Sequence, residues 1–115
     1  SYNDLNETEN LLLNNNIYRN QIYIINVEQE MKINKKIDLV ISLKSMGYHY
    51  PLETYFNLFK QCCSLNTVFI FDISTNNYNE NILRKYFNNI KTIYEEKSIH
   101  PMKRLYCEGL KLNHV

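Results

Sequence analysis

Residues 36–51, KIDLVISLKSMGYHYP, decide the fold of this chain, because they predict a buried strand that ends at a turn rich in polar and aromatic side chains. Leu39 to Ile41 form the continuous apolar run typical of a strand covered on both faces. Gly47 and Pro51 mark the turn that leads into the next helix. Since ligands of an open α/β sheet collect beyond the carboxyl ends of its strands, we expect a site at this turn.

The composition favours one ordinary globular domain, residues 1–115. A net charge of +1, with 44% apolar and 22% charged residues, gives no electrostatic reason to expect a nucleic acid or an acidic membrane as partner. No apolar run approaches the roughly 18 residues that span a bilayer, and the first residues lack the pattern of a signal peptide. We therefore expect no membrane association and a cytoplasmic location.

The cysteines and histidines do not form a recognisable metal-binding pattern. The cysteine count is odd, and two neighbouring cysteines lie inside a helical pattern where a bridge between them would strain the backbone. We predict buried free thiols and no metal site, because the histidines are too scattered to complete a zinc-binding set. The residues concerned are Cys62, Cys63, Cys107, His49, His100 and His114.

The first part of the chain predicts a helix followed by a strand. Residues 4–13 form an amphipathic pattern, with Asp4 and Glu7 placed as a cap and its reciprocal partner. Leucines followed by the run of asparagines at 14–16 favour the carboxyl end of that helix over a flexible linker. Residues 22–27 are rich in β-branched and aromatic side chains and predict a strand.

The remainder alternates between helices and strands. Pro51 suits the first position of a helix, and the apolar residues at helical spacing after it are Leu52, Tyr55, Phe56, Leu58, Phe59 and Cys62. Residues 67–71 predict a second buried strand that ends at Asp72, and residues 79–90 predict another helix. Looser alternation over 91–99 and clearer alternation over 102–109 predict a hairpin. The expected fold is α/β, a Rossmann-like and mostly parallel sheet with helices on its faces and an antiparallel carboxyl-terminal hairpin.

This order of elements resembles the carboxyl-terminal part of a class I S-adenosylmethionine-dependent methyltransferase. Residues 37–42, IDLVIS, resemble the fourth-strand motif of that family, and residues 45–55, SMGYHYPLETY, resemble a phrase of sugar O-methyltransferases, which often have Trp where this chain has Met46. The strand at 68–72 takes the place of the fifth strand, and the hairpin resembles the family's antiparallel last strands. The resemblance extends from about residue 22 to residue 110.

The resemblance implies a cofactor, S-adenosylmethionine, that this chain alone is poorly equipped to hold. The family binds it through a Gly-rich turn after the first strand, whereas this chain has only Gly47 and Gly109 and no Gly-x-Gly segment. The chain would lack the first two strands of the fold. Either a partner chain supplies them or the sheet pairs in a new way, so self-association into a homo-oligomer is an expected outcome.

The resemblance also suggests site residues, each with an ordinary structural alternative. His49 would be the catalytic base that accepts a proton from a substrate hydroxyl, or else a turn histidine. Tyr48, Tyr50 and Ser45 would bind the small-molecule substrate, a sugar or another hydroxyl compound, or else have ordinary packing and turn roles. Glu28 and Ser42 would contact the cofactor, although a solvated acidic loop is an equal alternative for Glu28.

The sequence thus supports two functions. The first is the carboxyl-terminal portion of a methyltransferase that acts on the oxygen of a sugar or other small hydroxyl substrate. The second is a non-catalytic α/β interaction or scaffolding module that binds a partner through an open sheet edge. A Gly-rich turn supplied by an upstream segment or a partner chain would favour the enzyme. A sheet complete within residues 1–115 would favour the module.

Overall fold

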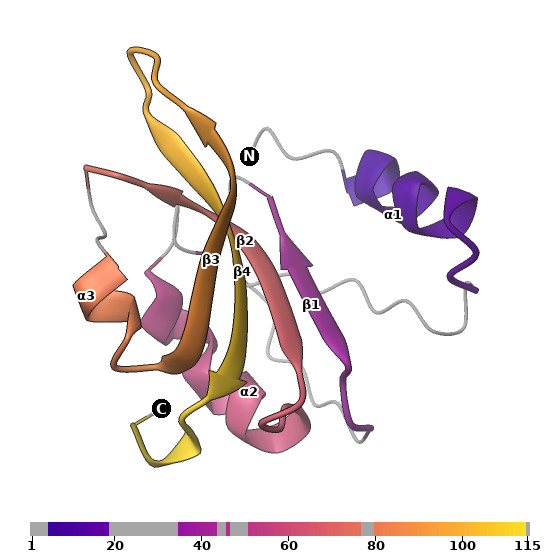
Figure 1. Cartoon of the computed structure of the whole chain (residues 1–115). Coiled ribbons are helices and arrows are strands. Elements are labelled where there is room, and N and C mark those ends of the chain that lie inside the picture. The colour runs from indigo at the N-terminus through magenta and orange to yellow at the C-terminus, as the bar shows by residue number, and fades with distance from the viewer. Residues whose placement is uncertain (1–4, 19–34, 44–45, 47–50, 77–79, 115) are drawn as a thin grey trace. The chain divides into compact units, whose positions relative to one another are not determined.

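A computed structural model describes residues 5–18, 35–43, 46, 51–76 and 80–114 of the chain (Figure 1). The chain divides into two compact units, residues 1–31 and 32–115, and each is described here by itself. The strand predicted at 22–27 and the Asp4–Glu7 helix cap lie outside the described residues and side chains. The single domain predicted for residues 1–115 stays a prediction.

The first unit contains helix α1, Leu5–Asn14, as the sequence predicted. Its carboxyl end is closed by backbone hydrogen bonds from Asn15 N (3.1 Å) and Ile17 N (3.0 Å) to Leu12 O and from Asn16 N to Leu13 O (3.2 Å). Asn16 has a φ of 66°, a left-handed conformation that asparagine tolerates better than most residues. The asparagine run therefore ends a helix, as predicted, because it satisfies the last carbonyl groups of α1.

The second unit is built on a four-stranded mixed sheet in the order β1-β2-β4-β3 (Figure 1). The predicted parallel arrangement is confirmed for two strands, since β1 (Leu39–Ser42) runs parallel to β2 (Val68–Ser74). The other two pairings are antiparallel, because β4 (Met102–Leu110) lies between β2 and β3 (Phe87–Glu96). The α/β class is confirmed, while the described sheet is mixed and not mostly parallel.

The connection from β1 to β2 contains the predicted helix. It begins as a 3₁₀ turn, η2 (Leu52–Tyr55), and continues as α2 (Phe56–Cys62). Pro51 directly precedes the first turn, with φ −57° and ψ 139°, one position earlier than predicted. Of the six apolar residues predicted at helical spacing, four are buried and two are half-buried. The buried residues are Leu52, Phe56, Phe59 and Cys62, and the half-buried ones are Tyr55 and Leu58.

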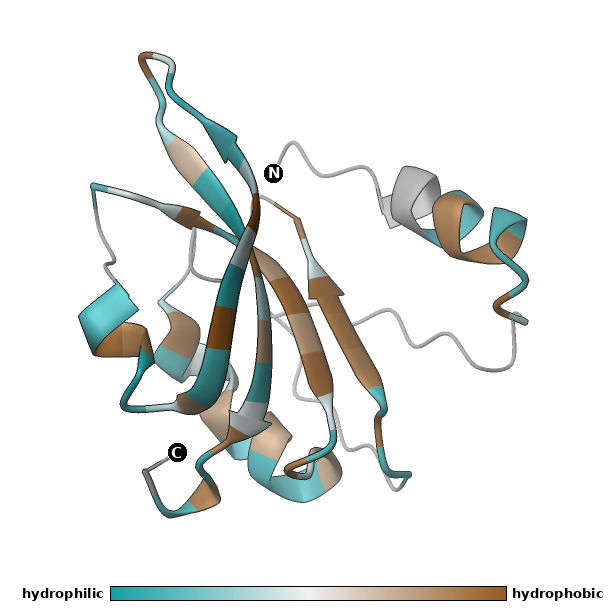
Figure 2. Ribbon diagram, viewed as in Figure 1, coloured by the Kyte–Doolittle hydropathy of each residue, from teal (hydrophilic) through white to brown (hydrophobic). Residues whose placement is uncertain are grey.

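An aromatic cluster joins α2 to the sheet. The ring of Phe59 meets that of Phe69 edge to face at 5.0 Å, and Phe69 meets Phe87 in the same way at 5.2 Å. Phe71 also lies beside Phe87, at 6.0 Å. Such pairs add directional stabilisation to the burial of a large apolar area. In Figure 2, α2 crosses behind the sheet, and the strands β1 and β2 in front of it are strongly hydrophobic.

Three details differ from the sequence prediction. Strand β2 does not end at Asp72 but continues to Ser74, because Asp72 pairs with a residue of β4. The helix predicted over 79–90 is a single turn, α3 (Glu80–Leu83), because residues from Phe87 onward join β3 and place the Phe87 ring in the aromatic cluster. Strand β1 is half-exposed instead of buried on both faces, since it is an edge among the described strands, and Leu39 is 40% exposed.

The predicted hairpin is confirmed and is longer than expected. Strands β3 and β4 pair from Phe87 opposite Leu110 to Glu96 opposite Met102. An irregularity between Thr92 and Tyr94 inserts an extra residue into β3, which bends an outer strand and increases its twist. Because β4 pairs on both sides, it is the strand that holds β3 to β2.

Gly109 provides a test of the packing at the open end of the hairpin, where β3 begins and β4 ends. Its φ is +71°, and a Cβ atom there would lie 2.7 Å from Cβ of Asn88. Gly109→Ala should lower the free energy of unfolding by about 3 kcal/mol, from backbone strain and overlap together. Urea unfolding measures this. In an Asn88→Gly background the overlap is gone, so the same substitution should cost only about 1 kcal/mol. Equal losses in both backgrounds would show that packing against Asn88 is unimportant.

Candidate functional site

The carboxyl ends of the parallel strands lie at one edge of the sheet, where the sequence predicted a site. Strand β1 ends at Ser42, which is in register with Phe71, so β2 extends three residues farther, to Ser74. Residues 43 and 46 continue the chain from β1. The described part of this edge therefore combines the end of β1 with the segment of β2 that follows Phe71.

Ser42 is the predicted site residue that the structure describes. Its Oγ atom accepts a hydrogen bond from the backbone N–H of Met46 at 2.9 Å. The side chain of Met46 is only 1% exposed, so the turn begins with a buried apolar anchor. The bond fixes the direction in which the chain leaves β1, and this is a local role for a serine at a strand end. The cofactor-binding role of Ser42 stays a prediction.

The other predicted site residues belong to two segments of the chain. His49, Tyr48, Tyr50 and Ser45 belong to the turn after β1, and Glu28 follows the strand predicted at 22–27; all five lie outside the described residues. Their assigned roles stay predictions. Because the two parallel strands present their carboxyl ends on one side of the sheet, the sequence also predicts that His49 lies near Asp72, and this proximity stays a prediction.

Asp72 forms a buried ion pair that the sequence did not predict. Its side chain is fully buried, and its two oxygens accept hydrogen bonds from Nε (2.8 Å) and Nη2 (3.1 Å) of Arg104. The two residues are direct register partners on β2 and β4. This two-bond geometry is the strongest arrangement between a guanidinium and a carboxylate. Asp72 thus joins β2 to β4.

The Arg104 guanidinium is held from a second side by the hairpin. Its central carbon lies 5.6 Å from the centre of the Tyr94 ring, and the Tyr94 hydroxyl donates a hydrogen bond to Glu96 (3.0 Å). The hydrogen bonds to Asp72 raise the pKa of Arg104 above its ordinary value. Arg104 is therefore a fixed cation whose hydrogen-bonding groups face Asp72.

The three cysteines are buried free thiols, as predicted. Burial raises the pKa of Cys63 and of Cys107 to about 12, and that of Cys62 rises for the same principal reason. Cys62 and Cys63 are not both helical, however. Helix α2 ends at Cys62, and Cys63 has an extended backbone with φ −106° and ψ 157°.

An open hollow of about 430 Å³ lies over the lower part of β3 and β4, away from the end of β1. Its walls include two carboxamides, an aromatic ring and charges of both signs, contributed by Asn88, Asn89, Tyr106, Lys91, Arg84 and Glu108. Some of these groups already have partners. Asn89 donates a hydrogen bond to Glu108 at 3.5 Å, and Arg84 pairs with Glu80, which is outside the lining, at 3.3 Å. The hollow is an open surface feature, and its lining contains none of the predicted site residues.

Within the described ranges, no three His, Cys, Asp or Glu side chains gather in a group that could hold a metal ion. None of the helices in the same part of the chain is long and apolar enough to cross a membrane. Comparison of the chain with family models, with curated proteins and with solved structures found no match.

The Asp72–Arg104 pair predicts a specific pattern of stability. Arg104→Met removes the guanidinium and leaves a buried carboxylate without it, so the free energy of unfolding in urea should fall by about 3 kcal/mol. The double variant Asp72→Leu/Arg104→Met should recover most of this loss, because it removes the buried charge as well. Arg84→Met removes an exposed ion pair and should change stability by less than about 0.5 kcal/mol. A double variant as unstable as Arg104→Met would contradict the account.

Proposed function

We propose that this chain is the carboxyl-terminal part of a class I S-adenosylmethionine-dependent methyltransferase that methylates a hydroxyl of a sugar or another small molecule. The observation that carries the proposal is the sheet order. Strands β1 and β2 are parallel and joined by a helix, and a closing hairpin places antiparallel β4 beside β2. The resemblance implies a fourth and a fifth strand followed by antiparallel last strands, and the described arrangement supports the proposal for this reason.

The local sequence at the end of β1 supports the same proposal. The motif at 37–42 occupies β1 and its approach, and the phrase at 45–55 begins at the anchored turn and ends in η2. Ligands of such sheets gather at this edge. We assign His49 the role of accepting the acceptor's hydroxyl proton, Tyr48, Tyr50 and Ser45 the role of binding the acceptor, and Ser42 and Glu28 the role of contacting the cofactor.

The described residues do not form a complete cofactor site. The family holds its cofactor on a Gly-rich turn, and this chain has two glycines. One of them, Gly109, lies in β4 against the side chain of Asn88. The space left by its missing side chain is therefore filled by protein and is not open to a cofactor. The proposal therefore requires that other residues, upstream or on a partner chain, supply the cofactor cradle.

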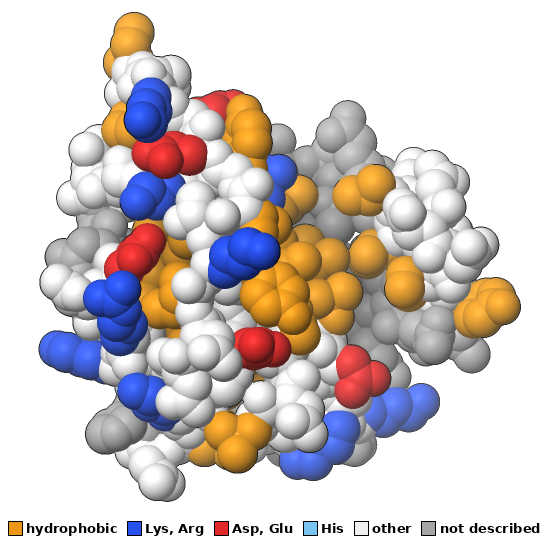
Figure 3. Space-filling model, viewed as in Figure 1, with side chains coloured by type: hydrophobic (Ala, Val, Ile, Leu, Met, Phe, Trp, Pro, Cys, Tyr) orange, Lys and Arg blue, Asp and Glu red, His pale blue; other side chains and the backbone are white. Residues whose placement is uncertain are grey.

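The alternative proposal is a non-catalytic interaction module. It is favoured by strand β1, an edge among the described strands whose Leu39 is 40% exposed. Figure 3 shows hydrophobic side chains gathered over β1 and β2 on the face of the sheet opposite α2. The cross-strand neighbours Ile41, Ile70 and Tyr106, on β1, β2 and β4, are each half-buried. A half-covered apolar face is the kind of surface that a partner protein covers.

Titration with S-adenosylmethionine distinguishes these functions. We expect a dissociation constant weaker than about 10 μM, because the cofactor cradle is incomplete. At millimolar cofactor, backbone amide NMR signals should shift at Ser42 and at residues 45–50, and should not shift at the hairpin loop near His100. His49→Ala should leave these shifts nearly unchanged, since His49 is assigned to the acceptor, and His100→Ala is the matched control.

One result would contradict the incomplete cofactor site, and another would contradict the methyltransferase proposal itself. Tight binding, at or below about 10 μM, would show that the chain carries a complete cofactor site. Shifts that are absent at residues 42–50, or that occur only around the hairpin, would remove the proposed site and leave the interaction module as the better account.

A further inference from the structure

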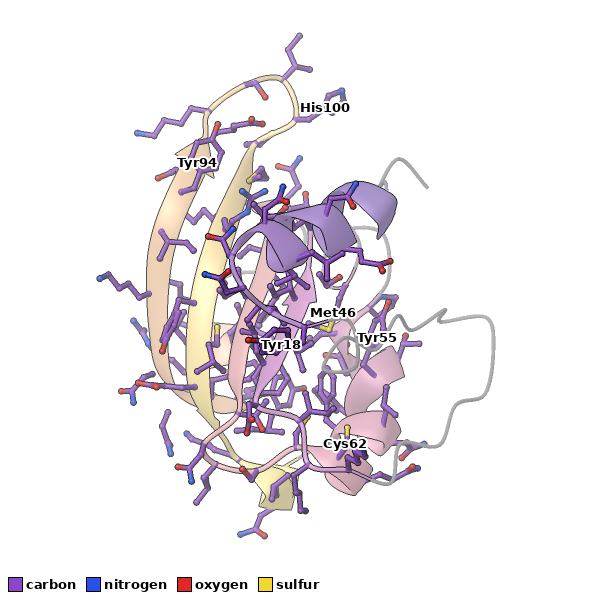
Figure 4. The ribbon with its side chains drawn as sticks, turned by 90° about the vertical axis from the view of Figure 1, so that its right-hand side faces the viewer. Tyr18, Met46, Tyr55, Cys62, Tyr94 and His100 are labelled. Carbon is purple, nitrogen blue, oxygen red and sulfur yellow. The ribbon has the colours of Figure 1, made fainter. Side chains whose placement is uncertain are left out.

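The carboxyl end of α2 brings two sulfur atoms together in a way that an uninterrupted helix does not. Figure 4 shows Cys62 at the end of α2, remote from Tyr94 and His100 at the hairpin tip. The helix stops at Cys62, and Cys63 is extended, so the Sγ atoms of the two residues lie 3.8 Å apart and share a hydrogen bond. Neighbouring helical residues point about a quarter-turn apart, so this contact depends on the helix ending between them.

We propose that Cys62 and Cys63 form a dithiol site that hydrogen peroxide oxidises reversibly to a disulfide between neighbouring residues. This proposal is independent of the proposed function. Because both thiols are buried and burial raises their pKa, the reaction starts from the small fraction of molecules in which the end of α2 has opened locally. There the thiolate of one cysteine attacks peroxide to give a sulfenic acid and release hydroxide, and the hydroxide takes up the proton lost by the thiol to form water. The second sulfur then displaces water from the sulfenic acid and forms the S–S bond. Overall, two thiols and one peroxide give one disulfide and two waters.

The required movement is small. Closing the bond brings the two sulfurs from 3.8 Å to about 2.05 Å. The Cα atoms of residues joined by a trans peptide are only about 3.8 Å apart, closer than in an ordinary disulfide, so the bridge is strained and easily reduced. This strain makes the site reversible by a small thiol.

The backbone around the pair shows what oxidation would change. The carbonyl of Cys62 accepts a hydrogen bond from Ile37 N at 2.7 Å, and the amide of Cys63 donates to Phe59 O at 2.8 Å. Thr67 Oγ1 completes the junction by donating to Ile37 O at 2.6 Å. A bridge would fix the two backbone torsions on either side of the Cys62–Cys63 peptide group. The same torsions set the directions of the Cys62 carbonyl and the Cys63 amide. Oxidation should therefore loosen the attachment of α2 to the segment that enters β1.

Cys107 is a control already present in the chain. It is as deeply buried as Cys63, and burial raises its pKa to the same value of about 12. Its cross-strand neighbours are Phe69 and Ile90, which carry no sulfur. If burial alone governed oxidation, Cys107 and Cys63 would react alike.

Peptide mass mapping of the peroxide-treated full chain tests the proposal. Trypsin cleavage after Lys60 and Arg84 places Cys62 and Cys63 together in residues 61–84, and cleavage after Arg104 and Lys111 isolates Cys107 in residues 105–111. We expect peptide 61–84 to lose two hydrogen atoms, about 2 Da, with 105–111 unchanged. Dithiothreitol should restore the original mass. Amide exchange at Ile37 and Cys63 should be faster in the oxidised protein.

Substitutions separate the pair from its surroundings. Cys107→Ser should leave the mass loss intact, whereas Cys62→Ser and Cys63→Ser should each abolish it. Because a buried serine could impair folding, the wild-type mapping decides the matter alone. Oxygen addition without bridge formation, a link between separate chains, or equal oxidation of Cys107 would overturn the proposal.

Discussion

The sheet depends on strand β4, the last strand in sequence and an interior one in space. It pairs with β2 on one side and with β3 on the other, so the hairpin can join the parallel pair only through β4. The Asp72–Arg104 bonds cross this junction between direct register partners. A slip of one residue would carry Arg104 to the opposite face and leave Asp72 buried without its guanidinium. The pair therefore favours a single register between the two halves of the sheet.

The two outer described strands differ in how they meet their surroundings. Strand β3 carries an irregularity at Thr92/Tyr94 and charged side chains at Lys91, Glu95 and Glu96, which are common defences against edge-to-edge association. Strand β1 is short and apolar, and its residues are half-exposed. An interaction through the described part of the sheet would therefore use β1 and its neighbouring face in preference to β3.

Much of this fold follows from local patterns. The apolar run at Leu39, the helical spacing from Leu52 to Cys62 and the alternation from Met102 each predicted the right element, because burial periodicity decides these segments. The helix predicted through Phe87 was wrong, since the same apolar residues fit a strand once β4 offers a partner. Asp72 was read as a strand end because an unpaired acid inside a strand is unfavourable. Arg104, which makes that position acceptable, lies 32 residues away.

The site was less predictable than the fold. The position of Ser42 at the end of β1 followed from the strand itself, but its bond to Met46 depends on the path of a turn. The proximity of Cys62 and Cys63 was missed because the periodicity extended the helix past its true end by one residue. Ser64 was the sequence signal that could have revealed the true end of the helix. With Leu65 and Asn66 it forms a turn that bonds to Thr67 and ends the helical hydrogen bonding.

The central claim is that β4 lies between β2 and β3, and cross-strand nuclear Overhauser effects measure it directly. The account predicts that Tyr106 shows backbone contacts to both Ile70 and Lys91, its partners on the two neighbouring strands. Backbone contacts from Ile70 to residues of β3, and none to Tyr106, would contradict it. They would mean that β3 and not β4 pairs with β2.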